Sequence, residues 1–292
     1  MLCMRGCHTD RTIRAGRCGM KATPKAARAA LHMWEEPCIS GKEGSGAVFF
    51  SGCPLQCVFC QNREIALGLA GQEIPEERLS ELFLSLEKQG ANNINLVTPT
   101  QFVPALVRQI PRAREAGLSV PIVYNTGSYE TPETVRALRG LVEIYLPDLK
   151  YRDSALSARY SHAPDYFSAA SSAIAEMVSQ TGPPVFDGRG MMVRGTIVRH
   201  MILPGHTKDS KEILKYLYGT YGDQIYISIM NQYTPMPGIE EAYPELGRRV
   251  TRREYERVLD YALSLGITQA YVQEGETAKE SFIPAFDGEG LL

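Results

Sequence analysis

From residue 47 onward, short apolar runs alternate with longer amphipathic segments. The runs are rich in β-branched and apolar residues, as is typical of buried strands, and they cover residues 47–50, 94–97, 122–124, 142–146, 193–203 and 225–230. The segments between them have helical periodicity, at residues 75–89, 103–116, 132–138, 168–179 and 208–218. Strands that alternate with helices predict an α/β fold with a parallel sheet. A further helix at 252–265 and a run at 269–273 would complete its C-terminal edge.

Residues 1–46 lack this pattern and are rich in Gly, Arg and Cys. We therefore expect a largely irregular, Cys-rich N-terminal extension at 1–46 and one main domain at 47–292, since 292 residues suffice for one large core. Several alanines predict a short helix over residues 25–33. The glycine-rich stretch 182–190 interrupts the pattern; we interpret it as a surface loop, the alternative being a loop that contacts substrate.

Composition narrows the class of protein. The net charge of −2 gives no global basic field that would attract nucleic acid or anionic lipid. No apolar run approaches the ~18–20 residues that a membrane span needs, and the N-terminus lacks an apolar stretch of signal-peptide length. We expect a cytoplasmic protein with neither nucleic-acid nor membrane partners.

The cysteines are crowded at one end of the chain. All seven lie between Cys3 and Cys60, which points to metal or cluster chemistry rather than disulfides. Cys53, Cys57 and Cys60 form a C-x₃-C-x₂-C triplet directly after the run at 47–50. Three thiolates on one loop can hold three irons of a cubane and leave the fourth iron open. A zinc knuckle or a purely structural cluster is the alternative, although zinc sites more often use paired C-x₂-C hooks.

This triplet, with Phe59 before its last cysteine, resembles the radical S-adenosylmethionine (SAM) superfamily. Residues 35–41, 44–46, 49–53 and 60–62 further resemble proteins similar to the pyruvate formate-lyase activating enzyme, the PflX-type relatives. The resemblance implies a partial (β/α)₆ TIM-like barrel that carries a [4Fe-4S] cluster on the triplet. It also implies an oxygen-sensitive enzyme of anaerobic metabolism, in which flavodoxin or ferredoxin supplies the electron that cleaves SAM to a 5′-deoxyadenosyl radical.

The implied reaction is hydrogen abstraction from a backbone glycine of a partner glycyl-radical enzyme. Two alternatives stay open. One is a radical SAM enzyme that modifies another peptide or a small molecule, and the other is a non-enzymatic iron–sulfur or zinc-binding protein.

The strand ends supply the expected cofactor contacts, because functional residues of β/α barrels lie where strands end and loops converge. The resemblance implies that SAM is contacted by Phe59, Thr98, Thr100, Asn125, Thr126, Ser128, Asp148, Lys150, Arg199, Gln232 and Tyr233. Thr98 and Thr100 stand where many relatives have a Gly-Gly-Glu motif for the SAM amino group. The turn at 125–128 could instead serve the backbone alone.

Three of these roles are more specific. Arg199 matches a residue that binds the SAM carboxylate, and Asp148 matches the site of a monovalent cation beside it. We expect Lys150 to act on a carboxylate of the substrate or cofactor, and we set aside a surface pair between Lys150 and Asp148. Tyr233 takes the place of a SAM-contacting histidine, Gln232 faces the adenine, and His200 points away and packs.

The other four cysteines could form a second metal site. Cys3, Cys7, Cys18 and Cys38 supply four thiolates, enough for a closed zinc site or an auxiliary iron–sulfur cluster. Cys38 could instead be a buried apolar thiol. In that case His8 could be the fourth ligand, or the site could be open.

Overall fold

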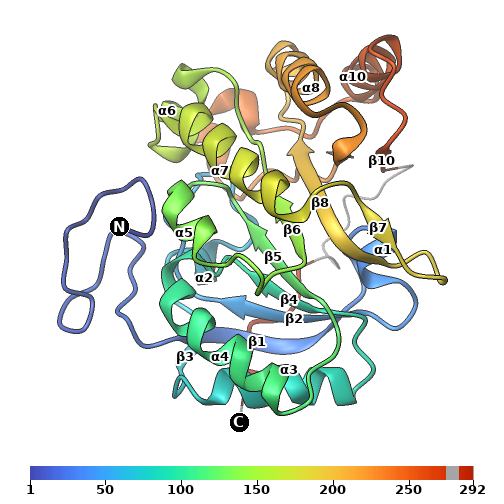
Figure 1. Cartoon of the computed structure of the whole chain (residues 1–292). Coiled ribbons are helices and arrows are strands. Elements are labelled where there is room, and N and C mark those ends of the chain that lie inside the picture. Colours follow the sequence, from blue (N-terminus) through green and yellow to red (C-terminus); the bar gives the residue numbers. More distant parts are fainter. Residues whose placement is uncertain (274–282, 292) are drawn as a thin grey trace.

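The apolar runs form one curved parallel sheet in a computed structural model that describes residues 1–273 and 283–291. The six expected strands are β2 (Ser45–Phe50), β4 (Ile94–Val97), β5 (Ile122–Thr126), β6 (Ile144–Pro147), β8 (Met192–Met201) and β9 (Tyr226–Met230). The run at 269–273 contains β10 (Ala270–Val272), which extends the sheet parallel to β9. The order β10-β9-β8-β6-β5-β4-β2-β1-β3 leaves the sheet open, so the fold is the predicted partial barrel (Figure 1).

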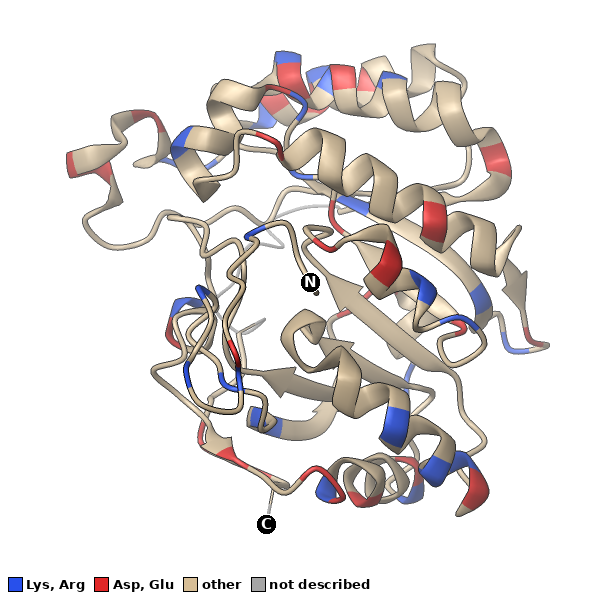
Figure 2. Ribbon diagram, turned by 60° about the vertical axis from the view of Figure 1, so that its left-hand side comes forward, with Lys and Arg blue, Asp and Glu red and all other residues tan. Residues whose placement is uncertain are grey.

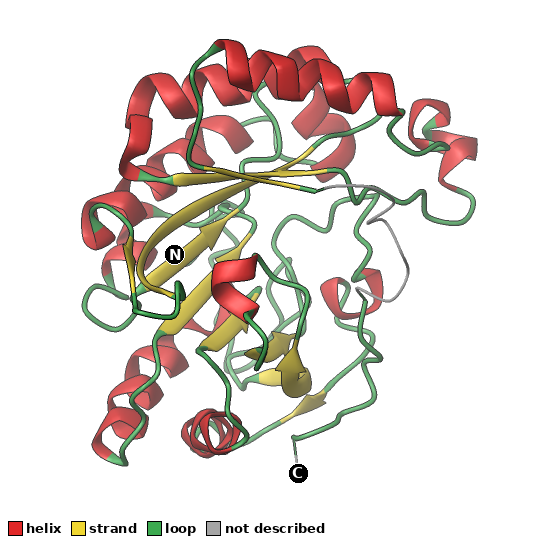
Figure 3. Ribbon diagram, turned by 90° about the vertical axis from the view of Figure 1, so that its right-hand side faces the viewer, coloured by secondary structure: helices red, strands yellow, loops and turns green. Residues whose placement is uncertain are grey.

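Helices cover the outer face of this sheet (Figure 3). Those expected from periodicity are α3 (Arg78–Lys88), α4 (Val103–Glu115), α5 (Pro132–Arg136), α7 (Tyr166–Thr181), α8 (Thr207–Tyr221) and α10 (Arg252–Ser264). Shorter ones that the pattern did not predict are α1 (Pro37–Ser40), α2 (Arg63–Ala66), α6 (Ser154–Ser161) and α9 (Ile239–Ala242). Three 3₁₀ turns, η1 (Thr100–Phe102), η2 (Gly222–Gln224) and η3 (Pro244–Leu246), complete the described elements.

The helix predicted over residues 25–33 is wrong: these residues form strand β1 (Lys25–His32). β1 pairs antiparallel with β2 on one side and with the two-residue strand β3 (Gln72–Glu73) on the other. Ala26, Ala27 and Ala29 are almost fully buried, so their small side chains let both faces of the strand be covered. Sheet pairing and burial thus override the helix propensity of alanine.

The N-terminal extension is irregular only as far as residue 24, because β1 and α1 integrate the rest into the barrel. The first residues project to one side of the sheet, beside α5 (Figure 1). The C-terminal segment returns to β1, where the amides of Ala29 and Gly288 bond to the carbonyls of Glu289 and Ala27 at 2.9 and 3.0 Å.

The stretch 182–190 is a hairpin rather than a plain loop. Its strand β7 (Val185–Phe186) pairs antiparallel with β8, and the exposed tip at 188–190 follows. The hairpin lies before the N-terminal end of β8, on the side of the sheet away from the strand ends that carry the expected site.

Two large apolar clusters hold the helices on the sheet. One packs α3 and α4 on β2, β4 and β5, with Phe83 and Leu106 completely buried. The other packs α7, α8 and α10 on β8 and β9. Charged residues of both signs alternate along the outer helices (Figure 2). None of the helices in the described part of the chain is long and apolar enough to cross a membrane.

Candidate functional site

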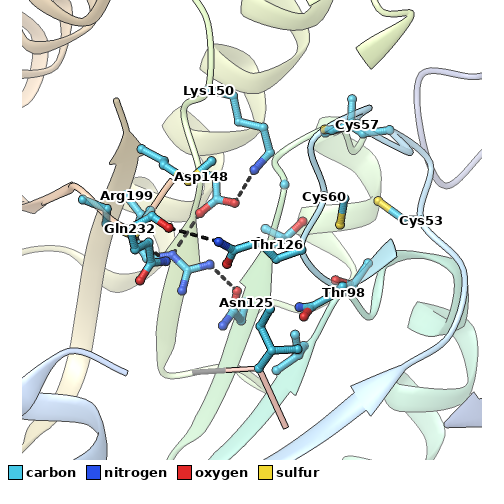
Figure 4. A pocket seen from close by; sticks show the side chains of 18 of the residues that line it. Cys53, Cys57, Cys60, Thr98, Asn125, Thr126, Asp148, Lys150, Arg199 and Gln232 are labelled. Carbon is cyan, nitrogen blue, oxygen red and sulfur yellow. Dashed lines mark hydrogen bonds and ion pairs between the residues drawn. The ribbon is translucent and has the colours of Figure 1, made fainter. Parts of the chain in front are cut away.

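A cavity of about 240 Å³ opens where the parallel strands end. It is bordered by the cysteine loop after β2 and by the ends of β4, β5, β6, β8 and β9. Of the predicted residues it brings together Cys53, Cys57, Cys60, Phe59, Thr98, Asn125, Thr126, Asp148, Lys150, Arg199 and Gln232. The sequence-predicted strand ends therefore do converge on one space (Figure 4).

The cysteine triplet occupies one wall of the cavity. Cys53, Cys57 and Cys60 project from one loop, opposite the charged side chains of β6 and β8 (Figure 4). The loop is tightened by the Cys60 amide, which donates to the Cys57 carbonyl at 3.0 Å. The Ser161 hydroxyl of α6 donates to the Cys57 sulfur at 2.9 Å, so α6 supports the loop from behind.

Burial disfavours the thiolate forms of Cys53 and Cys60. Burial, with the neighbouring cysteines, raises the pKa of Cys53 to about 11 and that of Cys60 to about 12. Thiolates at Cys53 and Cys60 require more positive charge than nearby Lys150 provides, and iron ions would supply it because ligation is coupled to loss of the thiol protons. The donor set and its surroundings therefore suit an iron–sulfur cluster.

Aromatic rings fix the same loop. Phe59 is 4 % exposed and packs edge-on against Tyr151, Tyr160 and Tyr233, with ring centroids 6.1–6.4 Å apart. Such edge-to-face contacts are favourable beyond simple area burial. Phe59 therefore anchors the loop and contributes one face to the cavity wall.

A buried ionic network faces the cysteines. The Arg199 guanidinium donates from Nε to Asp148 Oδ1 (2.9 Å), from Nη1 to Glu35 Oε2 (3.1 Å) and from Nη2 to Asn125 Oδ1 (2.6 Å). Its side chain is 14 % exposed. Glu35 also accepts from the amides of Asn95 at 2.9 Å and Asn125 at 3.1 Å. Residues from β4, β5, β6, β8 and the segment after β1 are thus tied together at one point.

The rejection of a Lys150–Asp148 pair is wrong. Lys150 Nζ lies 2.6 Å from Asp148 Oδ2, and both side chains are largely buried, at 21 % and 16 % exposure. Burial alone would raise the pKa of Asp148, but the adjacent Arg199 and Lys150 outweigh it and hold that pKa below its ordinary value. Both carboxylate oxygens already have a cationic partner, so the residues around Asp148 do not fit a bound monovalent cation.

Three predicted contacts lie away from the cavity. The hydroxyl of Thr100 donates to Glu130 Oε1 at 2.6 Å, and Thr100 lines a different cavity. Ser128 is completely buried in a left-handed turn with φ of 64°. Tyr233 is buried behind Phe59, and its hydroxyl donates to the Leu246 carbonyl at 2.7 Å. These side chains support the walls of the site rather than face it.

Sequence reasoning missed Glu35 as a site residue. Glu35 lies in the stretch that carries the family resemblance, but its segment was expected to be an irregular cap. Only the pairing of β1 with β2 brings Glu35 over the ends of the parallel strands. Gln61, also in that stretch, donates from Nε2 to the Gln232 carbonyl at 3.0 Å and joins the cysteine loop to the end of β9.

Cys38 is separate from the other N-terminal cysteines. It lies in a small apolar cluster with Ile39 and Met192, and burial raises the pKa of its thiol to about 11. The structure therefore does not bring Cys38 together with Cys3, Cys7 and Cys18, which lie at the opposite end of the extension.

An open parallel barrel with a cysteine triplet after its first parallel strand defines the class of protein. The family model of the radical SAM superfamily matches residues 47–217, more than half of the chain. The chain belongs to the radical SAM superfamily. Membership implies a radical SAM enzyme that uses a [4Fe-4S] cluster and SAM.

Individual relatives share 25 % or less of their aligned residues with this chain. The chain is 25 % identical over 277 residues to the uncharacterized protein MJ0674 of Methanocaldococcus jannaschii. The aligned region covers 92 % of this chain and 75 % of that protein. The structure of Streptococcus suis SuiB bound to S-adenosylmethionine has a TM-score of 0.50 at 15 % identity, over 77 % of this chain and 49 % of SuiB. A domain of a pyruvate-formate lyase-activating enzyme from Bacteroides vulgatus has a TM-score of 0.43 at 14 % identity, over 59 % of this chain and 91 % of that domain.

Proposed function

We propose that this protein abstracts a hydrogen atom from the backbone of a polypeptide, namely from a glycine of a partner glycyl-radical enzyme. When bound, the cluster and SAM together supply one-electron chemistry that yields a 5′-deoxyadenosyl radical. The electron comes from an external donor, flavodoxin or ferredoxin. A polypeptide substrate is supported by a groove that lies beside the cavity along β1.

The residues of this chain hold the two groups in place. Cys53, Cys57 and Cys60 would hold the cluster, and Phe59 packs their loop against the aromatic core. Arg199 and Lys150 offer positive charge for the SAM carboxylate. Around them, Asn125 and Thr126 offer further hydrogen-bonding groups from the end of β5.

The cavity is too small to enclose a large substrate as well. At about 240 Å³ it lies below the range of roughly 300–1,000 Å³ that is usual for ligand pockets. The cluster and SAM would fill it. The reacting group must therefore reach in from the mouth, as a loop of a protein can.

A second cavity of about 170 Å³ lies beside that mouth. We call it the β1 groove; its lining residues are Arg28, Ala30, Leu31, His32, Met33, Trp34, Phe49 and Pro284. The two cavities adjoin each other, because His32, Trp34, Phe49 and Pro284 line both.

The β1 groove has a lining of mixed polarity and is nearly neutral. Met33 is 43 % exposed, which leaves apolar surface for a partner. Burial, with nearby Arg28, lowers the pKa of His32 to about 4, so His32 is neutral near pH 7. Arg28 is itself paired with Asp287 and Glu289. These properties suit an uncharged, glycine-containing loop.

The test uses anaerobically purified, reconstituted and reduced protein with SAM and candidate glycyl-radical enzymes labelled with [2-²H]glycine. We expect an organic radical in the partner by electron paramagnetic resonance and deuterium in the 5′-deoxyadenosine that forms. The matched control is the Cys53→Ala variant, which should form neither.

Other outcomes identify the alternatives. Formation of 5′-deoxyadenosine without deuterium or a protein radical would mean that another peptide or a small molecule is the substrate. Failure of the reduced, iron-loaded protein to bind or cleave SAM would favour a non-enzymatic iron–sulfur protein, and a colourless zinc protein would exclude the cluster.

A further inference from the structure

Three cysteines outside the site line one further cavity. Cys3, Cys7 and Cys18 border a space of about 310 Å³ between the N-terminal segment and the barrel, and His8 stands at its exposed rim. Pro54, directly after Cys53, lines the same space from the other side. The cavity therefore adjoins the back of the cysteine loop.

The sulfur atoms of Cys7 and Cys18 both lie close to Gly16. A Cβ placed on Gly16 would lie 3.6 Å from the Cys7 sulfur and 3.7 Å from the Cys18 sulfur, so both atoms approach the same point. The backbone amide of Arg17 donates to the Cys7 sulfur at 3.3 Å. An amide donor of this kind stabilises a thiolate more than a thiol.

These groups do not form a site for a single metal ion as they stand. Tetrahedral zinc with Zn–S bonds of about 2.3 Å requires sulfurs about 3.8 Å apart. Within the described residues, no three His, Cys, Asp or Glu side chains converge closely enough to hold one metal ion. The same is true of Cys53, Cys57 and Cys60, the triplet that the family resemblance assigns to a four-iron cluster. Both triplets instead surround a cavity.

The N-terminal segment also needs a cross-link. Residues 4–24 contain no helix or strand, and Met4 and Ile13 are 42 % and 68 % exposed. Only Cys18 and Met20 of this segment join the apolar core, and arginine side chains add polar attachments: Arg5 donates from Nε to the Pro54 carbonyl at 2.7 Å and from Nη2 to the Ser161 carbonyl at 2.7 Å. A segment without helix or strand gains order from ligand bonds when it binds metal.

We propose that Cys3, Cys7 and Cys18 hold a second, auxiliary iron–sulfur cluster, with His8 as the fourth ligand. Histidine in place of cysteine on such clusters has precedent. Cys38 takes no part. The cluster would fasten the N-terminal segment against the back of the loop that carries Cys53.

Metal bound by the two cysteine triplets can be distinguished with two variants, each lacking one triplet. Iron, acid-labile sulfide and zinc are measured in each variant after anaerobic reconstitution. The Cys53→Ala/Cys57→Ala/Cys60→Ala protein should keep about two to four irons per chain, with matching sulfide, on the N-terminal triplet alone. The Cys3→Ala/Cys7→Ala/Cys18→Ala protein should lose that iron and keep about four. Cys38→Ala is the matched control and should retain the full iron content.

The proposal is overturned if the first variant holds no iron, or if it holds zinc in place of iron and sulfide. It is also overturned if the second variant has the iron content of the unaltered protein. Should the second variant fail to fold, the first still decides. His8→Ala should keep iron but change the electron paramagnetic resonance spectrum of the auxiliary cluster; an unchanged spectrum would remove His8 from the ligands. None of these readouts depends on the proposed reaction.

Discussion

At the scale of single residues, Arg199 has two roles: it is expected to bind SAM, and it holds the buried ionic network together. It matches the residue expected to bind the SAM carboxylate, yet Asp148, Glu35 and Asn125 already accept its hydrogen bonds. Three fixed acceptors hold the planar guanidinium in one orientation, as bidentate recognition of a carboxylate requires. Arg199 is therefore oriented by the protein before the cofactor arrives.

Replacing Arg199 by Ala should weaken SAM binding by roughly 10- to 150-fold, which corresponds to the loss of a charged hydrogen bond of about 1.5–3 kcal/mol. Calorimetry on anaerobic, cluster-loaded protein measures the affinity. Arg108→Ala, which removes an arginine that is 57 % exposed and paired with Glu76, is the control and should leave the affinity unchanged. An Arg199→Ala protein that folds and binds SAM normally would show that Arg199 is only structural.

Burial of His200 should make the free energy of unfolding depend on pH between about pH 6.5 and pH 4. Its Nδ1 lies 2.8 Å from the Leu149 carbonyl and its Nε2 2.9 Å from the Ser210 hydroxyl, so the neutral ring is matched on both sides. Burial lowers the pKa of His200 to about 4, whereas the unfolded chain has about 6.5. The unfolded state therefore binds the extra proton between these values, and stability present above pH 6.5 falls as the pH drops toward 4.

We expect this one residue to contribute a loss of roughly 3 kcal/mol in the free energy of unfolding across that window. The His200→Gln variant should be less stable at pH 7.5 but lose less stability between pH 7.5 and 5. Denaturant unfolding at both pH values measures the difference. His32, whose pKa is also lowered, is left intact and gives both proteins the same remaining slope. Equal slopes in the two proteins would contradict the assignment.

At the scale of elements, the sequence predicted the parallel strands better than the segments before them. Runs such as residues 47–50 of β2 are apolar on both faces, and this pattern is nearly independent of neighbours. β1 was missed because its alanines carry no alternation and because its burial depends on β2 and on the returning C-terminal segment. Partners distant in sequence decided its structure.

Dependence on the surrounding fold also explains which of the predicted site residues face the cavity. Asn125, Asp148 and Arg199 lie at strand ends, where the barrel itself fixes direction, and all three face the cavity. Thr100 and Ser128 lie one turn beyond, in η1 and in a left-handed turn, where local backbone geometry directs the side chains elsewhere. Two or three residues beyond a strand the prediction is therefore uneven: Lys150 and Gln232 still face the cavity, whereas Thr100 and Ser128 do not.

The junction between β2 and the cysteine loop allows a test at this scale. Gly52 has φ of 84°, and a Cβ there would lie 2.2 Å from Met20 Cγ and 2.7 Å from the Cys18 carbonyl. Gly52→Ala should therefore combine left-handed strain of about 1 kcal/mol with overpacking of about 1–3 kcal/mol. We expect a lower melting temperature and reduced iron loading.

Gly90 provides the matched control. It has a similar φ of 94°, but a Cβ there would meet nothing within 4 Å. Gly90→Ala should lose only the backbone strain, about 1 kcal/mol, and should load iron normally. If both variants were equally stable, the N-terminal segment would not press on the cysteine loop as the structure places it.

At the scale of the whole molecule, the open edge of the barrel and the C-terminal return shape the approach to the site. The charged outer helices carry both signs without a single-sign field (Figure 2). The exposed apolar side chains Met33 and Trp34 lie beside the cavity mouth. A partner protein is therefore expected to dock over the β1 groove through both apolar and polar contacts, with little electrostatic steering.

Because the β1 groove has lining residues that the cofactor cavity lacks, a substitution at one of them should impair binding of a protein substrate without impairing SAM cleavage. Met33 lines the β1 groove but not the cavity that would hold the cluster and SAM. Met33→Asp should raise the apparent KM for a protein substrate about tenfold or more, because a charge would have to be desolvated on docking. Slow SAM cleavage in the absence of partner should be unchanged.

Leu263→Asp is the matched control, since Leu263 is 72 % exposed on α10 and is not among the residues that line the groove. It should alter neither the KM for the partner nor the slow cleavage. Rates of 5′-deoxyadenosine formation with and without partner, measured over a range of partner concentrations, give both quantities. If Met33→Asp left the KM for a verified protein substrate unchanged, the substrate would reach the cavity by another path, and the β1 groove would lose its role.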